Sequence, residues 1–242
     1  MAPSATVDPA EIAKFAALAA EWWDPKGPFA ALHRMNPVRL AFIREHAAAH
    51  FGGNGARALK GLSVLDVGCG GGLVSAPLAR MGANVTAIDA GEDAVRAAAS
   101  YAEGAGLKIA FRAVTAEALA AESPGAFDLI TALEIVEHVA DLGAFLRACE
   151  TLLKPGGLLV ISTINRTPQA RALALFAAEK VLHMAPDGAH DYEKLVKPEE
   201  LEEAAPALEW EPPAGISFDP IGRTWRQSHD VSINYLRAAV KR

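Results

Sequence analysis

The stretch that decides the fold is Leu65-Asp66-Val67-Gly68-Cys69-Gly70-Gly71-Gly72. It is typical of a buried strand that runs directly into a glycine-rich turn and then into a helix. Gly68, Gly70 and Gly72 let the backbone turn sharply and leave no Cβ between the main chain and a ligand, beside the positive end of the helix. Three glycines in five residues increase the conformational entropy lost on folding, and we expect no gain in packing to offset that loss. We therefore expect a nucleotide-like cofactor at this turn.

Two common phosphate-binding loops do not fit this stretch. The dinucleotide fingerprint needs a glycine at position 73, where the chain has Leu73. No lysine of the Walker type follows the glycines. The sequence therefore disfavours a loop that grips a pyrophosphate or a nucleoside triphosphate.

Around the glycine turn, short β-branched runs alternate with alanine-rich helical stretches from Leu62 onward. This alternation is typical of βαβ units on a parallel sheet. The expected strands are Ser63–Val67, Asn84–Asp89, Lys108–Ala113, Phe127–Leu133 and Gly157–Thr163. The expected helices lie around Leu73–Met81, Ala94–Gly104, Thr115–Ala121 and Leu142–Leu153. We predict one α/β domain with a doubly wound, mostly parallel sheet.

Further elements flank this core. They are a helix that begins at Asp8-Pro9, a second helix from about Pro37 to His50, a helical insertion at Pro168–Met184, a charged helix from Pro198 and a last strand at Asp230–Val240. Within a single domain of residues 1–242 we thus expect a helical cap (1–60), a cofactor-binding core (61–165), an insertion (166–200) and C-terminal strands (201–242).

The composition excludes several classes of protein. The 242 residues carry 29 Asp and Glu against 23 Lys and Arg, a net charge of −6, which disfavours a nucleic-acid binder that neutralises phosphates. The longest uncharged run, Val67–Ala79, contains four glycines and is shorter than the ~20 apolar residues of a membrane-spanning helix. Two cysteines and the absence of a signal-peptide pattern at the start predict a cytoplasmic protein.

Asp89 ends the second expected strand, next to the glycine turn. A carboxylate at this place accepts hydrogen bonds from both hydroxyls of an unphosphorylated ribose. The alternative is that Asp89 caps the next helix across Gly91. With the glycine turn before it, we favour the ribose.

Glu134, Glu137 and His138 follow the fourth expected strand. Their i, i+3, i+4 spacing gathers two carboxylates and an imidazole on one face of a helical turn. Either the three bind a divalent cation, or His138 acts as a general base that a glutamate orients. A third interpretation is that Glu134 caps a helix and His138 packs beside it. Asn165-Arg166, past the fifth strand, either contact a ligand or end the strand.

Six motifs together resemble one known family over nearly the whole chain. They are WWDPKGPFAALHRMNPVRL, LDVGCGGG, EIVEHV, KPGG, STINR and HDYEKLVKP, in this order. The chain is similar to the ubiquinone-biosynthesis O-methyltransferases, a family of class I S-adenosylmethionine-dependent methyltransferases. The resemblance implies a seven-stranded, Rossmann-like sheet. It also implies methylation of phenolic oxygens on 2-polyprenyl-6-hydroxyphenol and 3-demethylubiquinol.

The resemblance also carries site residues. The family's cofactor contacts fall on Arg39, Gly68, Asp89 and Leu133, and Gly70 belongs to the same loop. Arg39 would bind the methionine carboxylate with its forked cation. The family's ExxEH motif, a divalent metal site, falls on residues 134–138 and favours Mg²⁺, although the spacing alone does not choose among Mg²⁺, Mn²⁺ and Zn²⁺.

The insertion is the part that we expect to meet lipid. Gln169–Met184 carries leucines, a phenylalanine and basic residues. A polyprenyl tail cannot be drawn into water cheaply, at ~0.8 kcal/mol per methylene, so the enzyme should work at the inner-membrane surface as a peripheral protein. Ordinary core packing of an amphipathic helix is the alternative. A complex with other enzymes of ubiquinone biosynthesis is a further expected partner.

Two other functions fit part of the sequence. One is a methyltransferase of a soluble small molecule, with the same fold and cofactor. The other is a protein that binds S-adenosylmethionine without turnover. Glu134, Glu137 and His138 argue against the second, because a pure binder has no need of two acids and an imidazole beside the cofactor.

Overall fold

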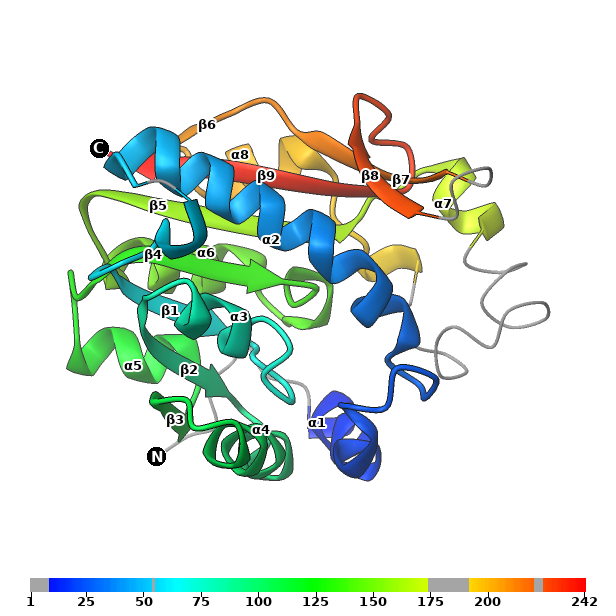
Figure 1. The fold of residues 1–242 in the computed structure, drawn as a ribbon. Coiled ribbons are helices and arrows are strands. Elements are labelled where there is room, and N and C mark those ends of the chain that lie inside the picture. Colours follow the sequence, from blue (N-terminus) through cyan, green and yellow to red (C-terminus); the bar gives the residue numbers. More distant parts are fainter. Residues whose placement is uncertain (1–8, 54, 174–191, 220–223) are drawn as a thin grey trace.

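The computed structural model describes residues 9–53, 55–173, 192–219 and 224–242, which are organised around one sheet (Figure 1). Its strands lie in the order β3-β2-β1-β4-β5-β9-β7-β8, with β6 paired to β9 off this path. They are β1 Ser63–Val67, β2 Asn84–Asp89, β3 Ile109–Ala113, β4 Phe127–Leu133, β5 Leu153–Ile164, β6 Leu208–Trp210, β7 Ala214–Asp219, β8 Thr224–Ser228 and β9 Asn234–Lys241. The five strands β1–β5 pair in parallel, and the last strands pair antiparallel.

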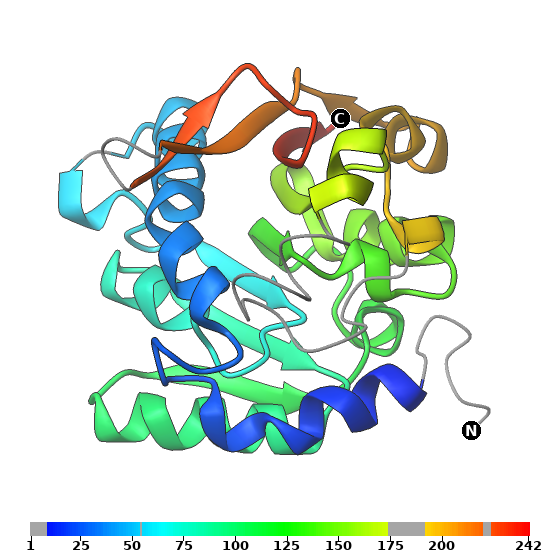
Figure 2. The same ribbon diagram turned by 90° about the vertical axis from the view of Figure 1, so that its right-hand side faces the viewer.

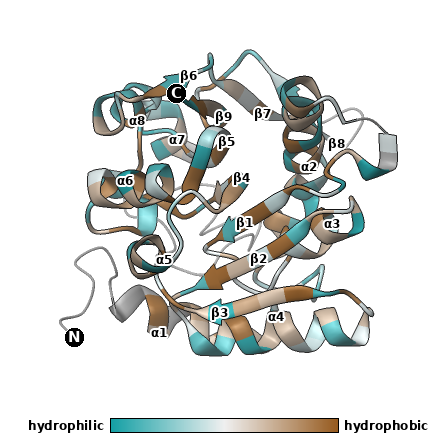
Figure 3. Ribbon diagram, turned by 90° about the vertical axis from the view of Figure 1, so that its left-hand side faces the viewer, coloured by the Kyte–Doolittle hydropathy of each residue, from teal (hydrophilic) through white to brown (hydrophobic). Residues whose placement is uncertain are grey.

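The central strands are apolar and buried, as strands of a parallel sheet covered on both faces must be (Figure 3). Val67 pairs with both Ile88 and Ala132, so β2, β1 and β4 end at the same edge of the sheet. The residues just after these strands are therefore brought together. They include the glycine turn, the acid at the end of β2 and the first glutamate after β4.

Helices cover both faces of the sheet, which confirms the doubly wound class. The helices are α1 Pro9–Ala17, α2 Ala30–Phe51, α3 Ser75–Arg80, α4 Glu92–Gly104, α5 Ala116–Glu122, α6 Leu142–Leu152, α7 Pro168–Leu173 and α8 Pro198–Ala204, with short 3₁₀ turns η1 Ala19–Glu21, η2 Gly55–Arg57, η3 Val136–His138 and η5 Tyr192–Lys194. On one face, Phe42 of α2 and Leu78 of α3 belong to one apolar cluster. On the other, α5, α6 and α8 contribute Leu119, Leu146 and Leu201 to a second cluster.

The long helix α2 begins at Ala30, so the predicted start near Pro37 is wrong. Pro37 lies inside the helix and is exposed, where proline removes one backbone hydrogen bond. The turn before it is fixed by tertiary contacts. Met35 and Asn36 are buried, and Asn36 Nδ2 donates to the carbonyl of Leu73 at 3.0 Å. These contacts outweigh the local preference for ending the helix.

The sheet has nine strands within the described residues, where seven were predicted. The expected last strand is confirmed as β9, which pairs antiparallel with β5 from Asn234 to Val240. The additional strands flank β9: β6 pairs near Lys241 and β7 near Leu236. Pro212-Pro213 separates these two strands, because proline cannot donate to a ladder. β8 forms a hairpin with β7 and adds the edge of the sheet.

The insertion is described only in part. Its first turns form α7, and the charged helix predicted from Pro198 is confirmed as α8. Residues 174–191, which include most of the segment expected to meet lipid, lie outside the described residues. Within the described part of the chain, no helix combines the length and the apolar character that crossing a bilayer requires.

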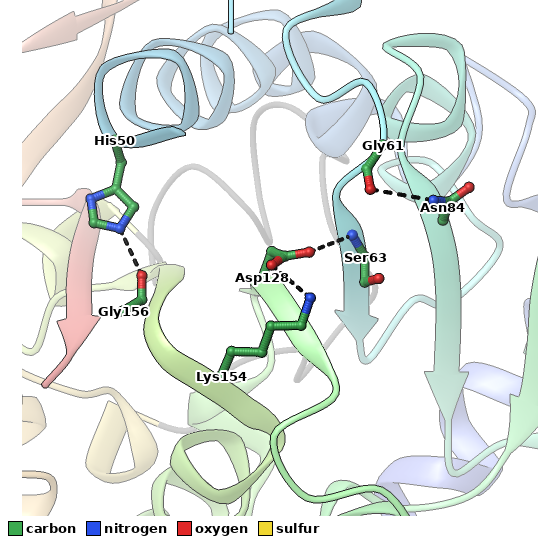
Figure 4. A network of polar contacts seen from close by, with 7 residues as sticks. All are labelled: His50, Gly61, Ser63, Asn84, Asp128, Lys154 and Gly156. Atoms are coloured by element: carbon green, nitrogen blue, oxygen red, sulfur yellow. Dashed lines mark hydrogen bonds and ion pairs between the residues drawn. The ribbon is translucent and has the colours of Figure 1, made fainter. Parts of the chain in front are cut away.

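At the amino ends of the strands, polar residues tie neighbouring segments together (Figure 4). Both carboxylate oxygens of Asp128 are used: one accepts from the backbone N–H of Ser63 and the other from Nζ of Lys154, each at 2.8 Å. His50 of α2 contacts the carbonyl of Gly156 at 2.7 Å. This network fixes the ends of β1, β4 and β5 away from the glycine turn.

Candidate functional site

The glycine turn follows β1 in the conformation that the sequence predicts. Gly68, Gly70 and Gly72 have φ of 69°, 49° and 83°, in the left-handed region that glycine favours. At Gly68 a Cβ would also lie 2.9 Å from the side chain of Ile135. The expectation that the glycines have no packing role is wrong, because a Cβ at Gly70 would lie 2.5 Å from the ring of Trp22. Packing against Ile135 and Trp22 thus requires small residues here.

Asp66 lies just before the turn, inside the buried part of β1. It is 2% exposed, and its two carboxylate oxygens accept from Ser75 Oγ at 2.5 Å and from Thr131 Oγ1 at 2.8 Å. Burial raises the pKa of Asp66 from 3.8 to about 6. No role was assigned to it from the sequence, although an acid within an apolar strand is a signal in itself.

Asp89 lies beside the turn and is half-buried. Its Oδ2 accepts from the N–H of Gly70 at 2.9 Å and its Oδ1 from the N–H of Gly91 at 2.8 Å. Burial raises the pKa of Asp89, and these backbone hydrogen bonds oppose the rise. The bond to Gly91, which precedes α4, is the capping contact that was weighed as an alternative. Each oxygen keeps a lone pair for a ligand hydroxyl, so capping and ribose binding are compatible.

The N-terminal cap covers the turn. Figure 2 looks at the molecule from the side where α1 lies, next to α4. Between α1 and α2, the ring of Trp22 lies on the glycines, and Nε1 of Trp23 donates to the carbonyl of Gly71 at 2.9 Å. Trp23 also stacks on Tyr101 of α4 at a centroid distance of 3.3 Å. The two tryptophans thus join the cap to the core.

At the end of β4, Glu134 has a φ of 53°, unusual for a residue other than glycine. Its Oε1 lies 2.8 Å from Nη2 of Arg39 and accepts from Ser162 Oγ at 2.7 Å. Arg39 comes from α2 and is 2% exposed. Leu133 precedes this glutamate and is buried, beside Ser162 in the register of β4 and β5. Two residues expected to touch the cofactor, Arg39 and Leu133, are therefore brought to the same edge.

Glu137 lies in the 3₁₀ turn η3 and is 2% exposed. Its Oε2 accepts from Thr163 Oγ1 at 2.9 Å. Burial and the nearby charge of Glu134 raise the pKa of Glu137 from 4.5 to about 8, so it holds its proton at neutral pH. His138 is half-buried, and its ring meets Phe15 of α1 edge-on at a centroid distance of 5.4 Å.

The three residues do not gather on one helical face as predicted. Glu134 stands outside η3, and it bonds to Ser162, whereas Glu137 bonds to the next residue of β5. Neighbouring residues of a strand point to opposite faces, so the two glutamates bond on opposite sides of β5. Among the described residues, no three His, Cys, Asp or Glu side chains are placed to hold a metal ion. In this arrangement the residues do not fit a divalent cation.

The residues after β5 mainly end the strand. The side chain of Asn165 is 6% exposed and donates to the carbonyl of Val231 at 2.8 Å. Arg166 donates to the carbonyl of Glu193 at 3.1 Å and forms an ion pair with Glu200. These contacts support the interpretation that Asn165 and Arg166 end the strand. They also fix the start of the insertion.

Comparisons with known proteins identify the family. A family model described as a methyltransferase domain matches residues 40–207. The ubiquinone biosynthesis O-methyltransferase of Caulobacter vibrioides is 51% identical, over 99% of this chain and 97% of the relative. The protein of the same name from Sinorhizobium medicae is 49% identical, over 97% of this chain and 96% of the relative. The chain belongs to the ubiquinone biosynthesis O-methyltransferase family.

Solved structures confirm the methyltransferase fold. The magnesium protoporphyrin IX methyltransferase of Synechocystis with bound SAH has a TM-score of 0.64 at 17% identity, over 96% of this chain and 100% of that one. A SAM-dependent methyltransferase of Aquifex aeolicus has a TM-score of 0.57 at 17% identity, over 96% and 98% of the two chains. As a member of the ubiquinone biosynthesis O-methyltransferase family, the chain is an S-adenosylmethionine-dependent enzyme.

The edge of the sheet fits that cofactor. The glycine turn has no side chains at positions 68, 70 and 72, and Asp89 offers acceptor oxygens beside it. In addition, two buried donors face no acceptor among the described residues: Nε of Arg39 and Nε1 of Trp22. A ubiquinone biosynthesis O-methyltransferase needs such donors, because its cofactor carries a carboxylate and ribose oxygens.

Proposed function

We propose that the chain methylates phenolic hydroxyls of polyprenylated ubiquinone precursors, namely 2-polyprenyl-6-hydroxyphenol and 3-demethylubiquinol. One observation carries this proposal: the chain is about half identical, over nearly its full length, to relatives named ubiquinone biosynthesis O-methyltransferases. The polar edge of the sheet supports it, since methyl transfer to a phenol needs a cofactor site and a group that takes up a proton at the same place.

Five residues would bind S-adenosylmethionine in this proposal. Asp89 accepts from the ribose hydroxyls, and Gly68 and Gly70 allow the ligand to approach the backbone. Arg39 binds the methionine carboxylate, a task suited to a buried guanidinium, and Leu133 provides an apolar contact. Because Arg39 is paired with Glu134, cofactor binding would compete with that ion pair.

The catalytic residues would be His138, Glu137 and Glu134. The sulfonium methyl moves to the phenol oxygen by in-line displacement, and the phenol proton must leave to an acceptor. Glu134 is already bonded to Arg39 and Ser162, and Glu137 holds a proton at neutral pH. We therefore propose His138 as the proton acceptor, because imidazole is the commonest general base in enzymes. The two glutamates then position the turn that carries it.

A divalent cation, with Mg²⁺ favoured, is the alternative route for the proton. It would require Glu134 to leave Arg39 and Glu137 to lose its proton. A bound cation would supply Lewis acidity toward the phenol. The chemistry of the donors is suitable for Mg²⁺, but their arrangement is not, so we assign no step to the cation.

Chelation separates the two routes. With a water-soluble short-chain demethylubiquinol, we expect turnover of the metal-stripped protein to stay within twofold of the untreated protein. We expect His138→Ala to be at least 100-fold slower at pH 7 and to recover rate at high pH, as the phenol ionises unaided. His50→Ala, at the opposite end of the sheet, is the matched control and should retain parental turnover. Loss of activity on chelation, restored by Mg²⁺, would replace the base with the metal.

We also propose that the protein acts at the inner-membrane surface from the cytoplasm, through residues 166–200, with other enzymes of the pathway nearby. The support is chemical: a polyprenyl tail leaves a bilayer only at high cost. Phe176→Ser with Lys180→Glu, in the part outside the described residues, should reduce co-sedimentation with anionic liposomes. Parental co-sedimentation of the folded double variant would contradict the contact. An enzyme of a soluble substrate would accept tail-free phenols as well as tailed ones.

A further inference from the structure

The side chain of Trp22 lies lengthwise along the glycine turn. A Cβ on Gly71 would lie 2.9 Å from Cδ1 of this indole, and a Cβ on Gly70 would lie 2.6 Å from its Cζ2. The ring edge that runs from Cδ1 to Cζ2 carries the N–H group, Nε1. The indole that carries this N–H group therefore spans the turn from Gly71 to Gly70, on the surface that the cofactor is expected to approach.

This N–H group has no acceptor among the described residues. The side chain of Trp22 is 8% exposed, and its ring stacks on Phe29 at a centroid distance of 3.7 Å, so water does not readily serve. An indole nitrogen can only donate, and leaving a buried donor without an acceptor costs free energy. A side chain in this situation is explained when a ligand supplies the acceptor.

The adjacent tryptophan shows the contrast. Nε1 of Trp23 donates to the carbonyl of Gly71, and its ring stacks on Tyr101. The carbonyl of Leu73 is likewise taken, by Asn36. Two carbonyls of the turn region thus accept hydrogen bonds from the cap, whereas the N–H of Trp22 has no acceptor among the described residues. Trp23 anchors the cap to the core, and the structure gives Trp22 a different task.

We propose that Trp22 is a cofactor-binding residue whose indole N–H donates to an oxygen of bound S-adenosylmethionine. The inference rests on the proposed cofactor site at Gly68, Gly70 and Asp89. An acceptor oxygen there belongs either to the methionine carboxylate or to the ribose. Both groups present the lone pairs that a buried donor needs, and both lie on a cofactor held by this turn.

Calorimetric titration with S-adenosylhomocysteine tests the proposal. Trp22→Phe keeps an aromatic ring against Phe29 and removes the N–H group together with part of the ring. We expect this variant to bind about tenfold more weakly than the parent. The melting temperature of ligand-free Trp22→Phe should fall less than that of Trp23→Phe, because both variants lose the same ring volume and only Trp23→Phe also loses a hydrogen bond within the protein. Trp23→Phe should show the opposite pattern, with a lower melting temperature and affinity within threefold.

Trp210→Phe is the distant control. Its N–H donates to the carbonyl of Ala205, so the variant should lose stability and keep the parental affinity. Parental affinity of Trp22→Phe would overturn the inference, as would equal losses of affinity and melting temperature in Trp22→Phe and Trp23→Phe. Failure of the parent to bind S-adenosylhomocysteine would overturn the proposed cofactor site itself, which is a distinguishable result.

A second ligand locates the acceptor. Methylthioadenosine has the ribose of the cofactor and lacks its carboxylate. If Trp22→Phe weakens S-adenosylhomocysteine alone, the indole donates to the carboxylate. If it weakens both ligands by the same factor, the indole donates to the ribose. Either result supports a direct contact, whereas weaker methylthioadenosine binding with unchanged S-adenosylhomocysteine binding would contradict it.

Discussion

The two ends of strand β4 use acidic residues in opposite ways. At the amino end, both oxygens of Asp128 accept from the protein, and the network around them is complete (Figure 4). At the carboxyl end, Glu134 is drawn into a left-handed conformation by Arg39 and Ser162, and Glu137 is buried with Oε1 lacking a partner among the described residues. The polar groups of the first end are fully paired, whereas the second end keeps a buried polar atom unpaired, at a cost in stability.

This difference predicts the largest effect for Arg39. Removing one partner of a buried ion pair leaves the other charge uncompensated, so Arg39→Ala should lower the free energy of unfolding by about 3–5 kcal/mol, measured by urea denaturation. The matched control is Arg44→Ala on the same helix. Arg44 is 48% exposed and pairs with Glu45 at 3.7 Å, so its loss should cost about 0.5 kcal/mol. Equal effects of the two variants would contradict the contrast.

The buried acids predict a dependence of stability on pH. The folded pKa of Asp66, about 6, lies above its ordinary 3.8, so its favourable contribution is complete below about pH 4 and is lost as the pH rises through 6. The shift corresponds to about 3 kcal/mol. Asp66→Asn should remove the fall in the free energy of unfolding between pH 4 and 6. The pKa of Glu137 is about 8, so Glu137→Gln should remove the corresponding fall up to pH 8. Unfolding curves at half-unit pH steps measure both. A parental slope in either variant would assign the pH dependence to other groups.

The acid of β2 tests ligand binding at the carboxyl end. Asp89→Ala should weaken S-adenosylmethionine by about 1–3 kcal/mol, because the ribose hydroxyls lose a charged acceptor. Asp93→Ala on α4, at an exposed side chain paired with Arg96, is the control and should not alter affinity. Isothermal titration at constant salt compares them. Unchanged affinity of Asp89→Ala would leave only the capping contact with Gly91.

The smallest effect belongs to the amino end. Lys154 is 41% exposed and pairs with the partly buried Asp128, so Lys154→Met should cost about 0.5–1 kcal/mol and less in high salt. Methyl transfer should remain at the parental rate. A loss above about 2 kcal/mol would show that the two ends of β4 do not differ as described.

The core of the fold was predictable from local pattern. Ser63–Val67, Asn84–Asp89 and Phe127–Leu133 are confirmed as strands with the predicted bounds, because each is an apolar run between turn signals. The pattern failed where tertiary contacts override it. Leu153 joins β5 before Pro155, since it pairs with Phe127 across the sheet. The strands β6–β8 have few apolar residues in alternation; β6 and β7 depend on β9 for pairing, and β8 depends on β7.

The position of the site at one edge of the sheet could be predicted from the sequence, but the contacts between its side chains could not. The glycine turn and Asp89 lie together because parallel strands end at one edge, which the order of the strands implies. The pairing of Arg39 with Glu134 was not predictable, since it joins a helix of the cap to the end of β4. The positive φ of Glu134 likewise comes from contacts, not from preference. The position of Trp22 on the glycine turn was indicated by one feature of the sequence, namely the two adjacent tryptophans at positions 22 and 23.

The stacked rings of the cap, one pair within it and one pair against the core, also give the molecule an optical signature. Trp23 lies nearly parallel to Tyr101, at 7° and 3.3 Å, and Trp22 lies parallel to Phe29, at 6° and 3.7 Å. Aromatic side chains held in one asymmetric setting produce near-ultraviolet circular dichroism, which vanishes when packing loosens even if helices persist. Undocking of the cap would therefore change the near-ultraviolet spectrum before the far-ultraviolet spectrum of the sheet and helices. Undocking of the cap can thus be observed separately from loss of the sheet and helices in this chain.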